Sequence, residues 1–211
     1  MPRSPGSNIS FWHDVPLYAD NGLLNFVVEI PKNTTAKFET NTRENDNPIK
    51  QDIMDGRLRY YPYNIHWKYG MHPQTWEDPK HLTPEADNAG GDNDPIDVVE
   101  IGNATLVTGG IYKVKPLGAY ALIDQGEVDW KVIVISDDDP KAALEFPGEL
   151  ADILVWFRDY KIPHGKPANT FAYASKPVDK EIALAVIQQT HELYNKLKSG
   201  QRENDEKLAL P

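Results

Sequence analysis

Three aspartates stand close together between Gly91 and Glu100, at Asp92, Asp94 and Asp97. In a turn that leads into a strand, this spacing can point all three carboxylates into one space, where they repel each other strongly. A divalent cation resolves that conflict, and oxygen ligands without His or Cys select Mg²⁺, Mn²⁺ or Ca²⁺ over zinc. For a DxD pair alone, a solvated turn is the commoner interpretation, so the stretch predicts a metal site only with support from elsewhere.

The spacing does not fit a calcium-binding EF-hand loop. Counting from Asp92, the sixth position holds Asp97 instead of the glycine that the loop needs for its sharp turn. The twelfth position holds Asn103 instead of the bidentate glutamate. We therefore expect the carboxylates to serve another kind of oxygen-ligand metal site.

A second acidic cluster lies between two apolar runs and contains Asp124, Asp129 and Lys131. One interpretation of this cluster is a hairpin with solvated acids. The other is a pair of further carboxylates at the same end of the fold, with Lys131 directed at an anion. A third run, Asp137–Asp139, precedes Pro140 and Lys141-Ala-Ala-Leu. Asp before Pro is typical of a helix N-cap with proline in the first turn, so we give this run a structural role.

Basic residues beside predicted strand ends or turns are candidates for phosphate binding, because arginine binds phosphate through its planar fork and lysine as a point charge. Taken singly, each of these basic residues is also consistent with an ordinary surface charge. The histidines show no metal-binding spacing, and His72 and His164 are expected to be structural. No Gly-x-x-x-x-Gly-Lys loop is present, which excludes a P-loop. The candidate bases are Lys37, Arg59, Lys131, Lys161 and Lys166.

Composition narrows the class of protein. The 211 residues contain no cysteine, which excludes disulfides, thiolate zinc sites and cysteine nucleophiles and fits a reducing compartment. A formal net charge of −10 disfavours nucleic acid and anionic membranes as partners. No apolar run approaches the ~20 residues of a membrane span, and residues 1–10 lack the apolar core of a leader. We predict a cytoplasmic protein.

The elements that must position these residues are short strands followed by two helices. Helical apolar periodicity marks residues 147–161 and 179–198, with Gly200 as the stop. Residues 1–10 are predicted to be disordered, 11–200 to form one domain and 201–211 to be a charged tail, while 70–95 are predicted to be loop. The fold class is α+β, mainly β, with a small barrel and helices outside it. Strands are predicted at 23–30, 37–40, 98–101, 111–114, 119–123 and 131–135.

Several separate motifs, in order, carry a resemblance over about residues 10–198. The sequence resembles family I soluble inorganic pyrophosphatases of the animal and fungal branch, which share the pattern D-x-D-P-x-D. The resemblance implies a five-stranded OB-like β-barrel with flanking helices and an inorganic pyrophosphatase domain over residues 11–200. The motifs are 11–17 (FWHDVPL), 28–31 (VEIP), 36–39 (AKFE), 73–79 (PQTWEDP), 92–97 (DNDPID), 126–131 (GEVDWK), 156–158 (WFR), 160–163 (YKIP) and 165–167 (GKP).

The resemblance also implies a reaction, the Mg²⁺-dependent hydrolysis of pyrophosphate to two orthophosphates, with Mn²⁺ or another divalent ion as a substitute. By it, Asp92, Asp97 and Asp129 would hold the first metal, and Asp97 would also touch the second. Asp94 would be the general base, facing a water between those two metals. Asp124 and Asp129 would hold a third metal that arrives with substrate. Several metals per site would offset the repulsion between a nucleophile and an anionic substrate.

By the same resemblance, Glu39 would hold a fourth metal and Glu29 would bind metal-bound water. Asp52 and Tyr69 would support the site from nearby. With Asp94, the catalytic set would include Tyr69, Arg59 and Lys161. The residues that would grip the two phosphates are Lys37, Arg59, Lys131, Tyr160 and Lys161.

The sequence departs from the family pattern at two places. Ile65 stands where the family usually has a tyrosine, and Tyr63, from a shifted loop, is the candidate to supply that hydroxyl. Asn33 stands where animal and fungal relatives often carry a tryptophan at a dimer contact, so both a homodimer and a monomer are open. Two rival functions are a non-catalytic OB-fold interaction module and a nucleotide hydrolase with similar two-metal chemistry.

Overall fold

A closed ring of five strands forms the centre of the structure, a computed structural model that describes residues 9–139 and 147–211. The ring runs β9-β1-β6-β8-β10 and closes through the β9–β10 pair. All neighbours are antiparallel except β8 and β10, which are parallel. The ring strands are β1 (Leu24–Ile30), β6 (Lys68–Met71), β8 (Asp97–Glu100), β9 (Ile111–Asp124) and β10 (Glu127–Ser136).

Short elements surround the barrel. The β2–β3 and β4–β5 pairs are small separate sheets, whereas β7, β11 and β12 extend the main sheet. Single 3-10 turns occur at Asp20–Gly22, Pro84–Ala86, Ile162–His164 and Tyr173–Ser175. The short strands are β2 (Phe38–Thr40), β3 (Ile49–Gln51), β4 (Ile53–Met54), β5 (Arg57–Leu58), β7 (Gly90–Gly91), β11 (Thr170–Phe171) and β12 (Val178–Asp179).

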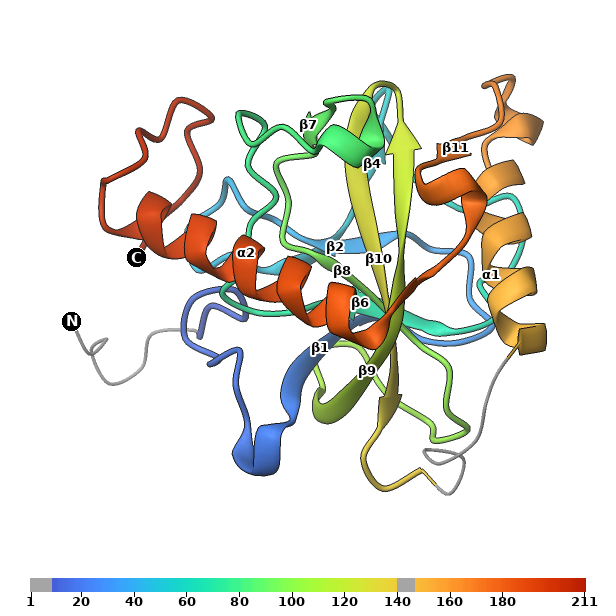
Figure 1. The fold of residues 1–211 in the computed structure, drawn as a ribbon, viewed down its shortest axis with the longest axis horizontal. Coiled ribbons are helices and arrows are strands. Elements are labelled where there is room, and N and C mark those ends of the chain that lie inside the picture. The colour runs from blue at the N-terminus through green and yellow to red at the C-terminus, as the bar shows by residue number, and fades with distance from the viewer. Residues whose placement is uncertain (1–8, 140–146) are drawn as a thin grey trace.

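Two helices pack against the barrel, α1 (Pro147–Asp159) and α2 (Lys180–Lys198), and Figure 1 shows α2 crossing in front of the strands. Successive side chains of a strand point to opposite faces, and β10 supplies two hydrophobic clusters in this way. Val132 and Val134 belong to the cluster that α2 covers, and Ile133 belongs to the cluster that α1 covers. The mainly-β α+β fold with an OB-like five-stranded barrel and flanking helices is confirmed.

Helix α2 begins and ends as its sequence indicates. The side chain of Asp179 caps the helix by accepting a hydrogen bond from the backbone N–H of Ile182 at 2.9 Å. Gly200, just after the helix, has a φ of 76°, a left-handed conformation that glycine adopts without strain. The predicted range of 179–198 therefore matches the helix and its cap.

Two segments differ from the sequence predictions. The two strands predicted at 111–114 and 119–123 are one strand, β9, which continues through Pro116 because a register shift against β10 between Ile133 and Val134 lies opposite the proline. Gly70 and Met71, predicted as loop, belong to β6. A Cβ at Gly70 would lie 2.0 Å from the Val27 carbonyl oxygen, so this glycine marks a close strand approach and not a turn.

The chain ends lie partly outside the described residues. The predicted disorder of 1–10 falls mostly on residues 1–8, which are not described, whereas Ser10 is buried and its hydroxyl donates to Asn47 Oδ1 at 2.7 Å. The helix predicted after Asp139 falls on residues 140–146, also outside them. Asp139 itself accepts a hydrogen bond from the Asn103 N–H at 2.6 Å.

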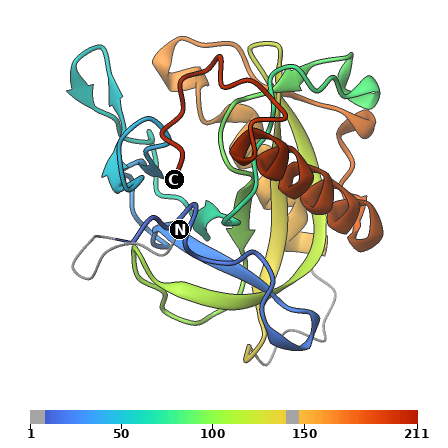
Figure 2. The same cartoon turned by 90° about the vertical axis from the view of Figure 1, so that its left-hand side faces the viewer.

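Residues 201–211 lie against the domain, and Figure 2 shows them turning back toward its N-terminal half. Leu208 is buried in a cluster with Trp12 and Trp76. The Ala209 N–H donates to the Thr42 carbonyl at 2.8 Å. Arg202 pairs with Asp78 through two hydrogen bonds of 2.9 and 3.0 Å. The charged tail is therefore held by both apolar and ionic contacts.

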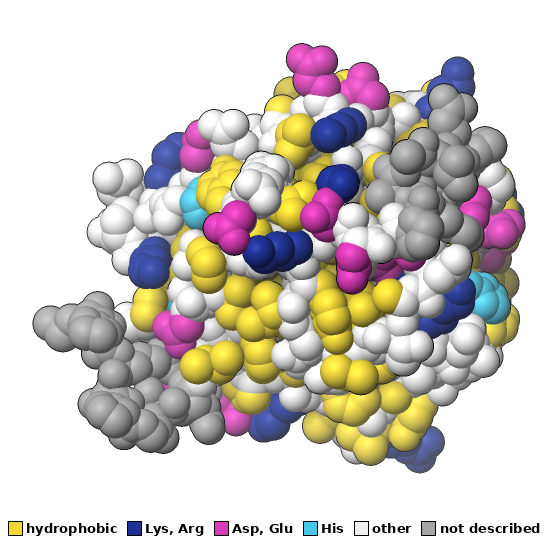
Figure 3. All heavy atoms as spheres, turned by 90° about the horizontal axis from the view of Figure 1, so that it is seen from below, with side chains coloured by type: hydrophobic (Ala, Val, Ile, Leu, Met, Phe, Trp, Pro, Cys, Tyr) yellow, Lys and Arg dark blue, Asp and Glu magenta, His cyan; other side chains and the backbone are white. Residues whose placement is uncertain are grey.

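The surface carries mixed charges. On the face seen in Figure 3, lysine, arginine, aspartate and glutamate side chains are interspersed with hydrophobic ones. No helix in the described parts of the chain is long and apolar enough to cross a membrane.

Candidate active site

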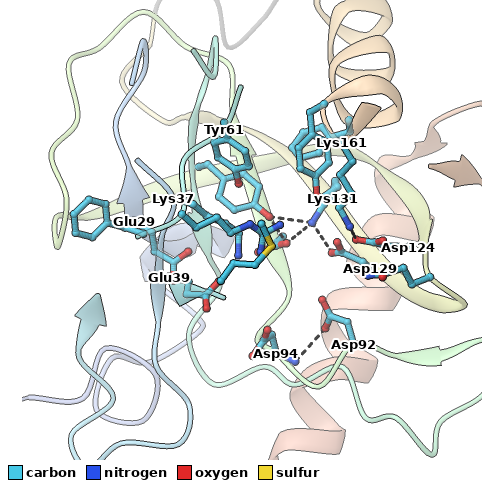
Figure 4. Close-up of a pocket in the computed structure, with 18 of the residues that line it drawn as sticks. Glu29, Lys37, Glu39, Tyr61, Asp92, Asp94, Asp124, Asp129, Lys131 and Lys161 are labelled. Carbon is cyan, nitrogen blue, oxygen red and sulfur yellow. Dashed lines mark hydrogen bonds and ion pairs between the residues drawn. The ribbon is translucent and has the colours of Figure 1, made fainter. Parts of the chain in front are cut away.

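One cleft of about 580 Å³ collects every residue predicted to be catalytic, to bind phosphate or to hold a metal ion. Figure 4 shows side chains from three directions meeting in it: Glu29, Lys37 and Glu39 on one side, Asp92 and Asp94 on another, and Asp124, Asp129, Lys131 and Lys161 on the third. The cleft therefore brings together strands, loops and the segment after α1. The predicted residues that line it are Glu29, Lys37, Glu39, Arg59, Tyr69, Asp92, Asp94, Asp97, Asp124, Asp129, Lys131, Tyr160 and Lys161.

The acidic loop is clamped from behind by the segment that precedes it. Backbone hydrogen bonds join the Glu77 N–H to the Asp94 carbonyl and the Asn93 N–H to the Glu77 carbonyl, both at 2.9 Å. The Thr75 hydroxyl accepts from the Ile96 N–H at 3.1 Å. Asn93 has a φ of 77°, a left-handed conformation that asparagine tolerates. The loop is thus rigid enough to present Asp92 and Asp94 on one wall.

Strand register brings Asp97 and Lys131 together. Lys131 on β10 lies opposite Asp97 on β8, and Nζ of Lys131 donates to Asp129 Oδ1 at 2.5 Å and to Asp97 Oδ2. The Tyr69 hydroxyl, from β6, donates to the same Asp97 oxygen. Three strands therefore contribute to one buried ionic cluster on the floor of the cleft.

Glu29 reaches the cleft through a β-bulge. Val28 pairs with Gly70 and Ile30 with Tyr69, so Glu29 is the extra residue of β1. A bulge bends its strand and re-aims a side chain. Oε1 of Glu29 accepts from the Thr40 N–H at 2.7 Å, which holds the end of β2 against β1. Glu29 thereby also places the β2 segment that carries Lys37 and Glu39.

One carboxylate organises the basic side of the cleft. Asp52 Oδ2 accepts from Arg59 Nη1 at 2.8 Å and from Lys37 Nζ at 3.4 Å. Lys37 also forms an ion pair with Glu39. Asp52 itself is outside the cleft lining and contacts two bases that belong to that lining.

The third wall follows the β9–β10 hairpin and α1. Asp124, at the end of β9, forms an ion pair with Lys161, while its Oδ1 is buried and has no hydrogen-bond partner. Tyr160 stacks on Trp156 with ring centroids 5.1 Å apart. This stacking fixes the start of the segment that carries Lys161.

Crowding of carboxylates shifts their titration in the metal-free cleft. Loss of water raises the pKa of Glu29 to about 8. Desolvation outweighs the nearby Lys131 and raises the pKa of Asp129 to about 7. Although Asp94 is open to the solvent of the cleft, desolvation by the cleft walls and the Glu39 carboxylate raise its pKa to about 7. Desolvation and the Asp129 carboxylate raise the pKa of Asp92 well above its usual value.

Lys131 shows the converse effect. Burial acts to lower its pKa, but the carboxylates of Asp129 and Asp97 outweigh burial and raise it well above the usual value. Lys131 is thus held as a cation among acids. The excess of acids over bases in the cleft still leaves negative charge that protons or further cations would balance.

The donor set fits divalent cations with oxygen ligands. One carboxylate oxygen each of Glu77, Asp92 and Asp129 lies within 4.8 Å of the others. Among the side chains that the structure describes, Asp124 Oδ1 and Glu77 Oε2 are buried without a hydrogen-bond partner. Such orphaned buried oxygens are rare in proteins. Hard oxygen donors without sulfur or imidazole suit Mg²⁺, Mn²⁺ or Ca²⁺.

Tyr61, which lines the cleft, and Glu77, which lies beside Asp92 and Asp129, were not predicted from the sequence. Tyr63, the candidate to supply the tyrosine hydroxyl, is 44% exposed and outside the cleft lining, whereas Tyr61 is buried in that lining. The Tyr61 N–H donates to the Thr35 carbonyl at 2.7 Å, which turns residue 61 inward. Ile65 is fully buried in the core. Nothing in the residue spacing distinguishes the two tyrosines.

Glu77 was the second residue missed, although it lies in the 73–79 motif that carried the resemblance. Desolvation and the Asp92 carboxylate raise its pKa well above the usual value. A glutamate between a tryptophan and an aspartate gives no spacing signal for a metal site. At the rim of the cleft, His164 and Lys166 also line the wall. His164, expected to be structural, is exposed there.

Comparison with known proteins agrees with this geometry. The family model described as inorganic pyrophosphatase matches residues 26–195. The chain is 59% identical over 217 residues to soluble inorganic pyrophosphatase 1, chloroplastic, of Chlamydomonas reinhardtii, covering 99% of this chain and 77% of that protein. It is 55% identical to soluble inorganic pyrophosphatase 6, chloroplastic, of Arabidopsis thaliana, covering 91% of this chain and 67% of that protein. Mouse inorganic pyrophosphatase is 46% identical, with 93% and 73% covered.

Solved structures give the same result. The type I inorganic pyrophosphatase of Toxoplasma gondii superposes with a TM-score of 0.87 at 42% identity, covering 91% of this chain and 90% of that one. A truncated Trypanosoma cruzi vacuolar soluble pyrophosphatase in complex with PPi has a TM-score of 0.87 at 40% identity, covering 90% and 80%. This chain belongs to the inorganic pyrophosphatase family.

Proposed function

We propose that the cleft hydrolyses inorganic pyrophosphate to two orthophosphates with Mg²⁺, and that Asp94 is the general base. The observation that carries the proposal is the convergence of all the predicted acids and bases on one cleft. Acids and bases that only solvate surface turns are not expected to converge on one cleft from three directions. The Trypanosoma cruzi relative, described in complex with PPi, supports the choice of substrate.

Asp92, Asp97, Asp129, Asp124 and Glu39 are proposed to hold the metal ions. Bound Mg²⁺ supplies Lewis-acid activation of water and neutralises charge on the substrate. Mn²⁺ satisfies the same oxygen donors and is expected to substitute. In the structure, Lys131 occupies part of this space by contacting Asp97 and Asp129. With its contacts to those carboxylates released, Lys131 would be free to turn toward a phosphate.

Asp94 is suited to accept a proton. Its carboxylate faces the cleft, and the side-chain contact of its Oδ1 is a long one, 3.4 Å from the Thr42 hydroxyl. A carboxylate so loosely held keeps an oxygen free for the attacking water. Glu29, held by the Thr40 N–H, orders the solvent on the opposite side.

The bases Lys37, Arg59, Lys131 and Lys161, with Tyr160, are proposed to bind the two phosphates. Their charges balance the phosphate oxygens as negative charge moves onto the departing group. Arg59 is oriented by Asp52, and Lys161 by Asp124. Tyr69 orients Asp97 and Lys131, a supporting role.

The test is phosphate release from pyrophosphate by the wild type, Asp94→Asn and Asp97→Ala, each with Mg²⁺ and with a chelator. We expect metal-dependent release by the wild type and losses on the order of 10²–10⁴-fold in both variants. Circular dichroism confirms that the variants are folded. A folded wild type without Mg²⁺-dependent release would refute the proposal, and faster release from ATP would favour the nucleotide hydrolase instead.

Compartment and assembly are separate proposals. The absence of cysteine predicts a reducing compartment, and the cytoplasm is the compartment predicted from the sequence, while two relatives carry the word chloroplastic in their names. Imaging of a fluorescent fusion made from the full gene decides between the two compartments.

Light scattering distinguishes a monomer from a homodimer. Asn33, at the position of the relatives' dimer tryptophan, is exposed with a φ of 64°, a conformation that tryptophan disfavours. Neither nucleic acid nor membrane is proposed as a partner.

A further inference from the structure

Glu77 is a buried acid with one oxygen bound and one free. It is 3% exposed, and its Oε1 accepts a hydrogen bond from the Trp130 N–H at 3.0 Å. Its Oε2 has no partner. Trp130 lies between Asp129 and Lys131, so this hydrogen bond ties Glu77 to the part of β10 that carries two site residues. The proposed function gives Glu77 no role.

The main chain fixes Glu77 beside the acidic loop. It exchanges two backbone hydrogen bonds with residues 93 and 94, each of 2.9 Å. A Cβ at Gly91 would lie 2.4 Å from the Glu77 carbonyl carbon and oxygen, so only glycine fits before Asp92. The separation between Glu77 and Asp92 is therefore set by backbone packing and not by a flexible side chain.

No cation in the described ranges 9–139 and 147–211 forms an ion pair with Glu77. Lys131 contacts Asp129 and Asp97, and Arg202, on the far side of the loop, pairs with Asp78. A carboxylate oxygen of Glu77 instead lies near two more carboxylates, since one ligand oxygen each of Glu77, Asp92 and Asp129 lies within 4.8 Å of the others. A buried carboxylate with an unpaired oxygen beside an acidic cluster requires a ligand that supplies positive charge or donors.

We propose that Glu77 is a positioning residue of the metal site that Asp92 and Asp129 help to form, and that its free Oε2 accepts a hydrogen bond from a water bound to the divalent cation. This inference rests on the proposed function for the presence of that cation. Mg²⁺ dehydrates reluctantly and usually keeps several waters. Contact through such a water suits Glu77, because its Oε1 is already bound to the Trp130 N–H and its Oε2 is free. Residues that hydrogen-bond to metal ligands in this way orient those ligands and tune the affinity of the site for its metal ion.

Glu77→Gln is the variant of choice, because it keeps the shape and an oxygen for the Trp130 N–H while its amide NH₂ cannot accept a hydrogen bond. The readout is Mn²⁺ binding to the full chain without substrate, followed by the electron paramagnetic resonance signal of free Mn²⁺. We expect the tightest Mn²⁺ site to weaken about 10–100-fold. Glu127→Gln is the matched control, because Glu127 is an exposed acid of the same cleft and its loss removes the same charge.

Two results would overturn the inference: unchanged Mn²⁺ affinity in Glu77→Gln, whether or not its metal-free melting point falls, or equal weakening of Mn²⁺ binding in Glu127→Gln. If Glu77→Gln does not fold, Glu77→Asp, which withdraws the carboxylate by one methylene, is compared in the same way. The titration uses no pyrophosphate. A wild type that binds Mn²⁺ but releases no phosphate would therefore refute the proposed function alone.

Discussion

The ammonium group of Lys131 donates to the hydroxyl oxygen of Tyr69 at 2.9 Å, and both groups contact the same oxygen of Asp97. Lys131 also lies 5.4 Å from the centre of the Tyr69 ring. Residues from β6, β8 and β10 thus share one hydrogen-bond network. The orientation of Asp97, a proposed metal ligand, depends on a tyrosine that contacts neither phosphate nor metal in the proposal.

Replacement of Tyr69 by Phe removes that hydroxyl and leaves the ring packed near Phe157. Because a partner of a metal ligand is lost, we expect Mg²⁺-dependent activity and Mg²⁺ affinity to fall about 10–100-fold. Steady-state phosphate release at a series of Mg²⁺ concentrations measures both. Tyr120→Phe is the control, since that hydroxyl is bound to the Leu150 carbonyl away from the cleft. Wild-type Mg²⁺ dependence in Tyr69→Phe would contradict the prediction.

Replacement of Asp52 by Asn is expected to act on substrate binding. Its carboxylate holds both Arg59 and Lys37, and without its charge the two bases lose a shared anchor. We expect KM for pyrophosphate to rise on the order of tenfold, the equivalent of one charged hydrogen bond, with a smaller change in kcat. Asp55→Asn, in the β4–β5 turn, is the control because Asp55 forms no ion pair with any described residue. A loss confined to kcat would show that Asp52 does not act through the bases.

Removal of metal is expected to destabilise the protein more at high pH. Glu29, Asp94 and Asp129 have pKa values of about 7 to 8 in the metal-free cleft. The folded state therefore binds more protons than the unfolded state between about pH 4 and pH 8, and acidification stabilises it. Cations replace those protons, and a ligand that binds only the folded state stabilises it.

Thermal unfolding with chelator and with millimolar Mg²⁺, at about pH 8.5 and about pH 6, measures the difference. The rise in Tm caused by Mg²⁺ should be larger at the higher pH, where no protons neutralise the acids. If Mg²⁺ raised Tm equally or more at the lower pH, repulsion between the clustered carboxylates would not be the source of the stabilisation by Mg²⁺.

His72 is expected to weaken the fold in acid. It is fully buried, its Nδ1 bonds the Asn25 carbonyl at 2.8 Å and its Nε2 has no partner, and burial lowers its pKa to about 4. The folded state thus binds fewer protons than the unfolded state below about pH 6.5. The free energy of unfolding contributed by this group therefore decreases as the pH is lowered. From pH 7 to pH 5 the loss amounts to about 2 kcal/mol. Urea unfolding of wild type and His72→Gln without divalent ions isolates this contribution as the difference between the two proteins in how the free energy of unfolding changes from about pH 7 to about pH 5. An equal change in both proteins would exclude it.

Residue types and local periodicity were enough to predict several elements. The apolar run of β1, the capped stripe of α2 and the apolar stripe of α1 are local patterns, and the structure has these elements at nearly the predicted bounds. The strand predicted at 131–135 is present as β10, which begins four residues earlier at Glu127. The acid spacing at Asp92, Asp94 and Asp97 is local as well. Local patterns were misleading at Pro116, because a register shift on the partner strand, invisible in the sequence, allows β9 to continue past the proline.

The sequence by itself determined the acidic chemistry, the preference for oxygen-ligand metals and the family resemblance, because these follow from residue types and their order. Only the tertiary structure decided which carboxylates share space. The bulge at Glu29, the choice of Tyr61 over Tyr63 and the approach of Glu77 to Asp92 all depend on contacts between segments distant in the chain. Such contacts arise from strand register and backbone packing, and no short stretch of sequence records them.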